Sequence, residues 1–333
     1  MFEWIEFQNY KALRKAKLPL SRFTLIVGAN GSGKSTALNA VFSIRDASQR
    51  KFEQIKTAGT PESETVTLQA RWGEKNNGYI IKAGWTRGGQ RGPSYGPEST
   101  NNIRQDAKPQ LALHHARIFC LDAEAISSAV QLQPTVELDR NGANLAGVLD
   151  RLRDQTPERF EALNKELARW IPEFDRILFD TNPKGQRLIE LRTREGKHSI
   201  KATDLSHGTL IALALLTIAY LPEPPSIVCL EEPDHGLHPR LLRDVKDALY
   251  RLAFPEGSGE KREPVQVIAT THNPYFLDLF KEHPEQIVIA EKVGLEAKFS
   301  RLSDREDLDE ILADAPLSEV WYSGVLGGVP TGT

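Results

Sequence analysis

The sequence predicts an α/β fold: a mostly parallel sheet covered by helices, with an antiparallel β layer and an inserted helical lobe. Three observations carry this prediction. A G-x-x-x-x-G-K-S motif, Gly28–Ser35, lies between an apolar strand and a helix. Several fully apolar runs alternate with helical segments, which is typical of parallel sheets. Two alternating segments, residues 65–72 and 79–85, flank the hairpin turn signal Asn76-Asn77-Gly78 and indicate the antiparallel layer.

Length and composition exclude some classes of protein. The 333 residues are enough for two domains or for one domain with a large insertion, and an apolar content of 40% supports a packed core. The net charge of −3 gives no global attraction to nucleic acid, although a local basic groove is compatible with it. No apolar run approaches the roughly 20 residues of a membrane span, and Met1–Trp4 lacks the pattern of a signal peptide. We expect a cytoplasmic protein without a membrane partner.

Hydropathy patterns place the elements of the first half. Residues 4–7 alternate and predict an edge strand, followed by a turn over 8–13, and residues 23–27 predict a buried strand. The polar residues 51–61 predict a loop. Residues 87–106 are rich in Gly, Pro, Ser, Asn and Arg and predict a mobile loop. We favour a solvated role for that loop over contact with nucleic acid or a partner.

The second half alternates strands and helices. Residues 141–170 have apolar positions at helical spacing, and Pro157 marks the start of a second helix. Cys120 and Cys229 each lie in an apolar run and are predicted to be small core residues. The Gly-rich tail, residues 324–333, is expected to fray. The other predicted elements are strands at 117–122, 187–192, 199–201, 226–230, 265–270 and 287–291, and helices at 209–220, 239–252 and 307–313.

The glycine-rich motif predicts a phosphate-binding loop. Its glycines let backbone N–H groups surround an anion, and the following helix adds its dipole. Lys34 is expected to contact the β- and γ-phosphates of a nucleotide, and the Ser35 hydroxyl to ligate Mg²⁺. The alternative is a Gly-rich turn that binds nothing. The residues assigned to the nucleotide are Asn30, Gly31, Ser32, Gly33, Lys34, Ser35 and Thr36.

Two carboxylates follow a buried strand, Ile227–Leu230. We expect Glu231 to hold Mg²⁺ or its water and Glu232 to orient and polarise the attacking water. Adjacent buried carboxylates repel each other, so a bound cation would relieve them. The alternative is a strand that ends in a solvated acidic turn.

Two further positions are candidates for contact with phosphate. His272 comes just after the next apolar strand, where it would donate a hydrogen bond to a γ-phosphate or else be structural. Ser206 is predicted to cap the helix that follows, and Gly208 to allow a close approach. That helix N-terminus would also offer Ser206 and its N–H groups to the nucleotide of another subunit.

The order of these motifs resembles the ATP-binding-cassette class of P-loop ATPases. It is more narrowly similar to stand-alone predicted AAA-family ATPases related to the RecF and SMC proteins. The matching segments are Asn9–Lys11, Gly28–Ser35, Asn141–Ala146, Leu205–Thr209, Glu231–Pro239 and Thr271–Pro274.

The resemblance implies roles for these segments. It implies Walker A at 28–36, a signature motif at 206–209, Walker B at 227–231 and a D-loop near 234–238. It also implies that Glu232 is the catalytic base and His272 the switch histidine. In this class two subunits enclose two ATP molecules, and each site is completed by the other subunit's signature motif.

The chain departs from the class in several places. The signature reads Ser-His-Gly-Thr, and only Gln131 and Gln133 are candidates for the Q-loop glutamine. No coiled-coil arm is predicted. No acidic cluster of a fused nuclease follows His272, so we expect any cleavage to need a separate partner.

These features predict an ATP hydrolase that uses ATP and Mg²⁺. Residues 1–122 and 221–333 would form the nucleotide-binding core, and residues 123–220 the inserted lobe. An ATP-dependent homodimer would act as a switch on DNA or on a separate effector such as a nuclease, in DNA maintenance or antiviral (anti-phage) defence. The alternatives are a transporter's nucleotide-binding subunit, disfavoured by the irregular signature, and a non-hydrolysing ATP-binding module, disfavoured by Glu232.

Overall fold

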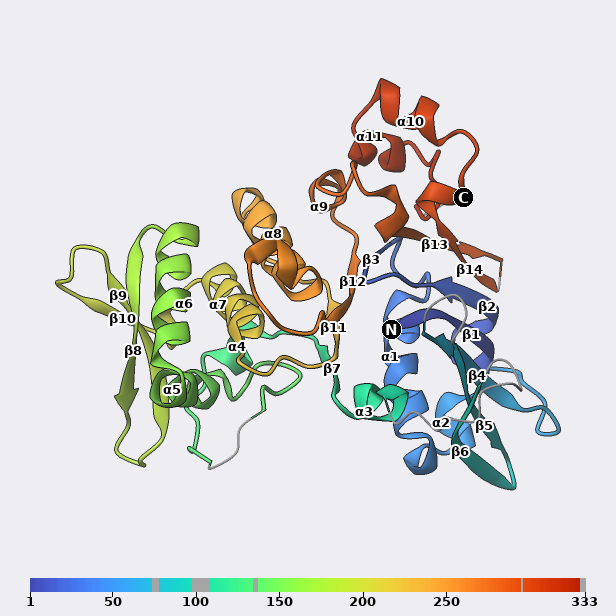
Figure 1. Ribbon diagram of the computed structural model, residues 1–333, viewed down its shortest axis with the longest axis horizontal. Helices are drawn as coiled ribbons and strands as arrows, with labels where there is room; N and C mark the ends of the chain where they lie inside the picture. Colours follow the sequence, from blue (N-terminus) through green and yellow to red (C-terminus); the bar gives the residue numbers. More distant parts are fainter. Residues whose placement is uncertain (74–77, 98–107, 134–136, 295, 330–333) are drawn as a thin grey trace. The chain divides into compact units, whose positions relative to one another are not determined.

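The computed structural model describes the chain except residues 74–77, 98–107, 134–136, 295 and 330–333. The chain divides into two compact units (Figure 1). The first comprises Met1–Ile118, Pro225–Cys229 and Pro264–Thr333, and the second Phe119–Pro224 and Leu230–Glu263. The second unit therefore includes residues 230–263 in addition to the lobe at 123–220 that we expected from the sequence.

A six-stranded sheet crosses the first unit in the order β14-β13-β3-β12-β11-β7. The central strand β3 is buried along its whole length and runs parallel to both of its neighbours, β12 and β13. This confirms the predicted parallel sheet. β14 pairs antiparallel with β13 and was not predicted. The bounds are β3 Phe23–Val27, β7 Ala116–Phe119, β11 Ile227–Glu231, β12 Gln266–Thr271, β13 Ile287–Val293 and β14 Glu296–Arg301.

A second, five-stranded sheet has the order β2-β1-β4-β5-β6. All four pairs of neighbouring strands are antiparallel, as predicted for this layer. The bounds are β1 Phe2–Tyr10, β2 Leu13–Pro19, β4 Val66–Trp72, β5 Tyr79–Thr86 and β6 Gly89–Pro97.

Three predictions for this sheet need correction. β1 lies between β2 and β4, so it is not an edge strand, and it extends to Tyr10, so the turn predicted at 8–13 is confined to Lys11 and Ala12. The mobile loop predicted at 87–106 contains β6, and residues 98–106 of it lie outside the described residues. Residues 76 and 77 of the predicted hairpin turn also lie outside them.

Helix α1, Lys34–Arg45, packs in one apolar cluster with both sheets of the first unit. Leu38 and Val41 of the helix share this cluster with Ile5 of β1 and Ile26 of β3. Burial on both sides fixes the helix, and with it the position of Lys34 at its first turn.

Shorter helices complete the first unit: α2 Phe52–Ile55, α3 Lys108–His114, α9 Pro274–Asp278, α10 Leu308–Asp314 and α11 Leu317–Tyr322. α2 lies within the loop predicted at 51–61. The tail does not fray as far as residue 329, because Leu326 is buried and the Gly328 carbonyl accepts a hydrogen bond from the Ala29 N–H at 2.5 Å.

The second unit combines helices with a small sheet. Its helices are α4 Ala123–Ile126, α5 Leu145–Gln155, α6 Pro157–Trp170, α7 His207–Tyr220 and α8 Leu242–Ala253. Pro157 opens α6, as predicted. The strands β8 Phe174–Thr181, β9 Arg187–Thr193 and β10 Ser199–Lys201 form an antiparallel sheet, of which β8 was not predicted.

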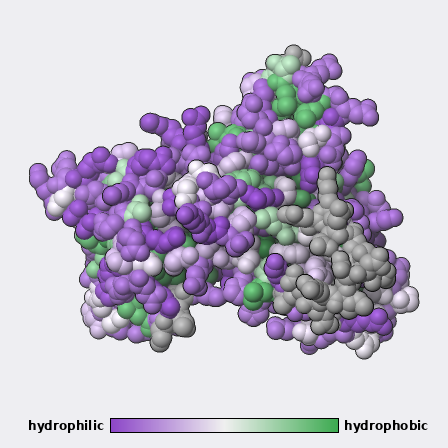
Figure 2. Space-filling model, in the orientation of Figure 1, coloured by the Kyte–Doolittle hydropathy of each residue, from purple (hydrophilic) through white to green (hydrophobic). Residues whose placement is uncertain are grey.

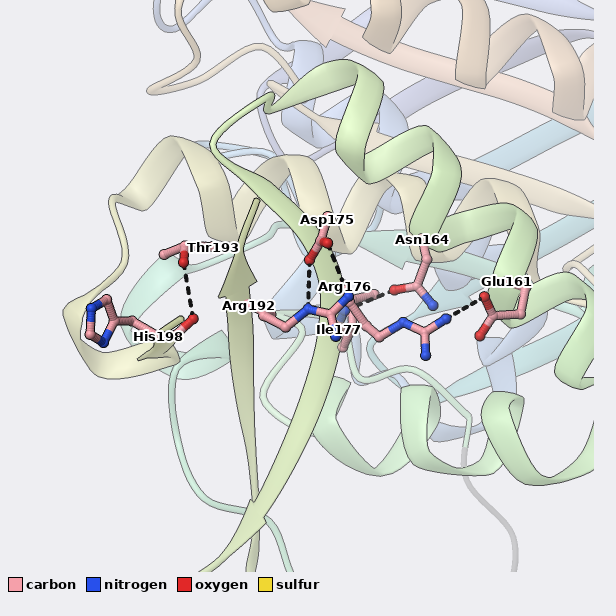
Figure 3. Close-up of polar contacts among 8 residues, drawn as sticks. All are labelled: Glu161, Asn164, Asp175, Arg176, Ile177, Arg192, Thr193 and His198. Atoms are coloured by element: carbon pink, nitrogen blue, oxygen red, sulfur yellow. Dashed lines mark hydrogen bonds and ion pairs between the residues drawn. The ribbon is translucent and has the colours of Figure 1, made fainter. Parts of the chain in front are cut away.

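Polar contacts join this small sheet to α6 (Figure 3). The Asn164 side chain of α6 accepts a hydrogen bond from the Ile177 N–H of β8 at 2.8 Å. Arg176 of β8 pairs with Glu161 of α6, whereas the two hydrogen bonds of 2.9 Å from Arg192 of β9 to Asp175 of β8 lie within the sheet.

The visible surface is mostly hydrophilic (Figure 2). Among the residues that the structure describes, none of the helices has the length and apolar character needed to cross a bilayer.

Candidate nucleotide-binding site

The phosphate loop connects β3 to α1, and two of its positions favour glycine for different reasons. Gly33 caps α1 with φ 98°, a conformation that strains any residue with a Cβ, and a Cβ there would also lie 2.8 Å from a methyl group of Leu13. A Cβ at Gly28 would lie 2.2 Å from the Ala290 carbonyl oxygen of β13. Because this second clash is with backbone, the loop is held tightly against β13 at Gly28.

Two polar side chains of the loop are buried. Lys34 is 6% exposed, and its ammonium donates to the carbonyls of Gly28 at 2.6 Å and Ala29 at 2.9 Å. Ser32 is 2% exposed, and its hydroxyl has no hydrogen-bond partner among the described residues. A buried hydroxyl without a partner costs free energy, so this loop is suited to an incoming anion that would accept from it. The other predicted loop residues are accessible: Asn30, Gly31 and Ser35 are exposed, and Thr36 is half-buried.

His272 follows the strand next to the loop. The parallel register pairs Val27 of β3 with Thr271 of β12, so His272 and the loop lie beyond the same ends of adjacent strands. Asn273 caps α9 by accepting from the Tyr275 N–H at 3.0 Å, and His272 is exposed. Ligands of open α/β sheets bind at this edge.

The two predicted carboxylates belong to the second unit. Glu231 is the last residue of β11, which follows β12 in the sheet order. Glu232 has φ 46°, a left-handed conformation that is unusual for a residue with a Cβ. Such strain costs about 1–3 kcal/mol and clusters at functional sites. Among the described residues, Glu232 shares a positive φ with only two other non-glycine residues, Asn9 and Lys11.

Two residues beside Glu231 were not predicted to be there. Arg140 places Nη2 3.5 Å from Glu231 Oε1. Cys120 is exposed, which corrects its prediction as a core residue, and its thiol hydrogen-bonds to Glu231. Although the residue is exposed, partial burial of its thiol raises the pKa of Cys120, and the charge of Glu231 raises it further. Cys229, by contrast, is buried as predicted. No sequence signal joins Cys120 and Arg140 to Glu231, because only the fold brings them together.

The predicted signature segment begins α7. The Ser206 hydroxyl accepts from the Thr209 N–H at 3.1 Å, which confirms the cap, and Ser206 is exposed. A Cβ at Gly208 would lie 2.9 Å from the Gly236 carbonyl oxygen, so Gly208 allows the close approach that we expected. The helix start thus packs against the segment predicted to be the D-loop.

The residues assigned to the metal suit Mg²⁺ chemically. The Ser35 hydroxyl and the Glu231 carboxylate are hard oxygen donors of the kind that Mg²⁺ prefers. The Glu231 carboxylate, 15% exposed, lies beside the Arg140 guanidinium and is followed by a second carboxylate, so this position already attracts positive charge. Ser35 and Glu231 belong to different units.

The parallel sheet, the phosphate loop and the carboxylates define a P-loop ATPase fold of the ATP-binding-cassette type. Residues 95–278, more than half of the chain, match the family model described as "AAA domain, putative AbiEii toxin, Type IV TA system". Residues 1–83 match a model described as "AAA ATPase domain". The chain therefore belongs to this AAA domain family, which confirms the predicted relationship.

Individual relatives agree with this assignment. An OLD nuclease from Thermus scotoductus is 22% identical over 358 aligned positions, covering 93% of this chain and 66% of the relative. The chain thus spans just under two thirds of that protein. The SMC head domain from Thermotoga maritima has a similar fold, with a TM-score of 0.52 at 18% identity, over 90% of this chain and 98% of that one. The recombination mediator RecF of the RecFOR pathway matches with a TM-score of 0.43 at 13% identity, over 90% and 98% of the chains, too weakly to carry an argument.

Proposed function

We propose that the protein is a Mg²⁺-dependent ATP hydrolase in which the phosphate loop and the Glu231–Glu232 pair act on one nucleotide. The observation that carries this proposal is the phosphate loop, in which Lys34 and the Ser32 hydroxyl, unpartnered among the residues that the structure describes, are buried at a helix N-terminus. The strained backbone of Glu232 supports the assignment of the base.

The reaction needs few protein groups. Glu232 accepts a proton from a water whose oxygen forms a bond to the γ-phosphorus, while the bond to the β,γ-bridging oxygen breaks and ADP leaves. Lys34 leaves the Gly28 and Ala29 carbonyls and balances the phosphate charge. His272 donates a hydrogen bond that reports the γ-phosphate. Bound Mg²⁺, held by Ser35 and Glu231, would neutralise charge on the phosphate oxygens.

Two substitutions test this chemistry. Lys34→Ala should abolish nucleotide binding, because the ammonium is the buried cation of the loop. Glu232→Gln should bind ATP yet hydrolyse it about 10²–10⁴ times more slowly, the usual contribution of a general base. Phosphate release and binding of a fluorescent nucleotide measure the two effects. Glu223→Gln, an exposed glutamate outside the site, is the matched control.

The outcomes separate the alternatives. Turnover at the wild-type rate by Glu232→Gln would show that another group is the base. Nucleotide binding without turnover under any condition would favour a non-hydrolysing ATP-binding module.

We also propose that ATP joins two copies of the chain. Ser206 and Gly208 stand at an exposed helix N-terminus, where backbone N–H groups favour an anion. One nucleotide would then contact the phosphate loop of one copy and the α7 N-terminus of the other. Formation and loss of this homodimer would be the switch.

We propose DNA as the substance on which the switch acts. One supporting observation is the relative named a nuclease. The other is the outer face of the five-stranded sheet, opposite the buried Ile5 and Phe7. Two rows of residues cross the strands on this face. One row is Lys15, Gln8, Thr67, Gly84 and Arg91, and the other is Lys17, Glu6, Gln69, Lys82 and Ser94. One groove on this face is lined by residues of β1, β2 and β4, including Lys15 and Lys17, and a separate one is lined by Lys82 and Arg91.

The basic side chains of this face suit contact with a phosphate backbone. Lys17 pairs with Glu6 at 3.0 Å, whereas Lys15, Lys82 and Arg91 are exposed on the same face. The neutral residues between them are glycine or have side chains that form hydrogen bonds. Such residues can contact the phosphates and sugars of DNA whatever its base sequence. A separate effector such as a nuclease, and a role in DNA maintenance or anti-phage defence, complete the proposal.

Salt dependence tests the DNA face. The triple variant Lys15→Ala, Lys82→Ala and Arg91→Ala should weaken duplex binding, measured by fluorescence anisotropy. The slope of log affinity against log salt concentration should decrease in magnitude by up to about 3, because each lost phosphate contact contributes about 0.9 to that slope. The control Lys165→Ala, Lys184→Ala and Lys197→Ala removes three exposed lysines of the second unit. Equal losses in both variants would contradict this face, and no binding by the wild type would favour a protein effector.

A further inference from the structure

The segment Asp139–Asn144 has no role in the function proposed above, although it overlaps the motif Asn141–Ala146 that the sequence singled out. It runs beside the chain that leaves β7. The Cys120 N–H donates to the Arg140 carbonyl at 2.8 Å, and the Asp122 N–H to the Asn141 carbonyl at 3.1 Å. The backbone of Arg140 is therefore held next to the end of β7, within the second unit.

A compact turn fixes the segment on its other side. Gly142 has φ 78°, and a Cβ there would lie 2.7 Å from Cγ1 of Ile126. The Asn144 side chain accepts from the Asp139 N–H at 2.8 Å and donates to the Glu137 carbonyl at 2.6 Å. Backbone hydrogen bonds before and after Arg140 thus determine where its side chain starts.

The Arg140 side chain is directed at the predicted metal ligand. Its Nη2 lies 3.5 Å from Glu231 Oε1, and the guanidinium is 52% exposed while the Glu231 side chain is 15% exposed. Arg140 and the neighbouring Glu232 are charged groups close to this carboxylate, and the Cys120 thiol hydrogen-bonds to it. Arg140 supplies positive charge beside the carboxylate that would hold Mg²⁺.

We propose that Arg140 is a positioning residue that holds Glu231 in the nucleotide-free protein and gives way when Mg²⁺ arrives with the nucleotide. This inference rests on the proposed function, because it assumes that Glu231 serves Mg²⁺. A guanidinium and a metal ion on one carboxylate oxygen repel each other, so Mg²⁺ competes with Arg140. The competition keeps the carboxylate oriented without nucleotide and raises the Mg²⁺ concentration that nucleotide binding requires.

A Mg²⁺ titration of nucleotide binding tests the proposal without reference to turnover. Binding of a fluorescent, non-hydrolysable ATP analogue is followed as Mg²⁺ is added. Arg140→Gln should lower the half-saturating Mg²⁺ concentration by about three- to fivefold, the effect expected of a partly exposed ion pair. Arg140→Lys should stay near the wild type, because its charge remains. Arg176→Gln removes the exposed partner of Glu161 and should change nothing (Figure 3).

A second measurement separates competition from direct contact with the nucleotide. In excess EDTA, Arg140→Gln and the wild type should bind the analogue within about twofold of each other, since Glu231 already balances the Arg140 charge. Thermal unfolding confirms that the variants are folded.

Three outcomes would overturn the inference. One is an unchanged or raised half-saturating Mg²⁺ concentration in Arg140→Gln. Another is an equal fall in Arg140→Lys, which would leave no role for charge. The third is a large loss of affinity in EDTA, which would show that Arg140 contacts the nucleotide. A wild type that does not bind the analogue at all would instead refute the proposed function, and the inference with it.

Discussion

Glu232 combines a strained backbone with a place directly after a buried strand. Its φ of 46° lies where a Cβ approaches the following carbonyl, at a cost of about 1–2 kcal/mol. Strain of this kind persists only where the surrounding structure imposes it. His235 donates its N–H to the Glu232 carbonyl at 3.0 Å, so the turn after β11 is itself hydrogen-bonded.

We predict that, at position 232, glycine gives a more stable protein than alanine, which is the reverse of the usual order of stability. Glu232→Gly should be more stable than Glu232→Ala by about 1 kcal/mol, because glycine adopts positive φ without a steric penalty. Both variants should lose hydrolysis. Urea denaturation measures the difference, and a Glu232→Ala variant at least as stable as Glu232→Gly would show that the backbone there is unstrained.

The reactivity of the Cys120 thiol depends on Glu231. Partial burial of the thiol and the Glu231 carboxylate both raise its pKa. A raised pKa leaves less thiolate near neutral pH, and the thiolate is the reactive form. We predict that Cys120 is alkylated more slowly than a free thiol and reaches its full rate at a higher pH. Glu231→Gln should accelerate the reaction. Mass spectrometry separates Cys120 from the buried Cys229. A rate that matches a free cysteine at every pH would contradict the prediction.

At the scale of elements, the phosphate loop depends on β13 as much as on its own sequence. The Ala290 carbonyl lies where a Cβ of residue 28 would be, and Gly328 packs on the same segment. The Ala29 N–H donates to Gly328, so the first turn of the loop is held between β13 and the chain after α11.

We predict that Gly28→Ala destabilises the protein by roughly 2 kcal/mol or more, since the clash is with backbone that cannot turn aside. It should also weaken nucleotide binding by displacing the loop. Gly88→Ala, where a Cβ meets open space, is the matched control and should be nearly neutral. Thermal unfolding measures the loss of stability, and nucleotide titration measures the loss of affinity. Equal stability of the two variants would mean that β13 moves freely.

The same elements show how far sequence reasoning extends. The G-x-x-x-x-G-K-S motif, the apolar strands and α7 are local patterns, and the structure contains each of them. β8 and β14 were missed because charged residues interrupt them, and pairing with β9 and β13 decides their conformation. The contacts of Glu231 with Cys120 and Arg140 join residues about a hundred positions apart. The hydrophobic periodicity of a sequence does not predict contacts between residues so far apart, and it does not predict the φ of Glu232.

At the scale of the whole molecule, the proposed reaction would draw its groups from both units. Lys34, Ser35 and His272 belong to the first unit, and Glu231, Glu232 and Ser206 to the second. A nucleotide that contacts both units would couple their positions. If the signature of a second copy also contacts the γ-phosphate, hydrolysis would release that copy, and the dimer would exist only while ATP is intact.

The oligomeric state of Glu232→Gln tests this coupling. With Mg-ATP its native mass should be near twice the chain's 37.2 kDa, and it should revert to the monomer without ATP. Ser206→Arg in the same background should bind nucleotide and stay monomeric, because a large cation would occupy the exposed helix start. Ser206→Ala removes the cap, at about 1 kcal/mol, without adding bulk, and should still dimerise. Dimers of Ser206→Arg would refute the composite site. A monomeric Glu232→Gln would mean that assembly needs DNA or an effector, and a larger mass would identify a bound partner for isolation.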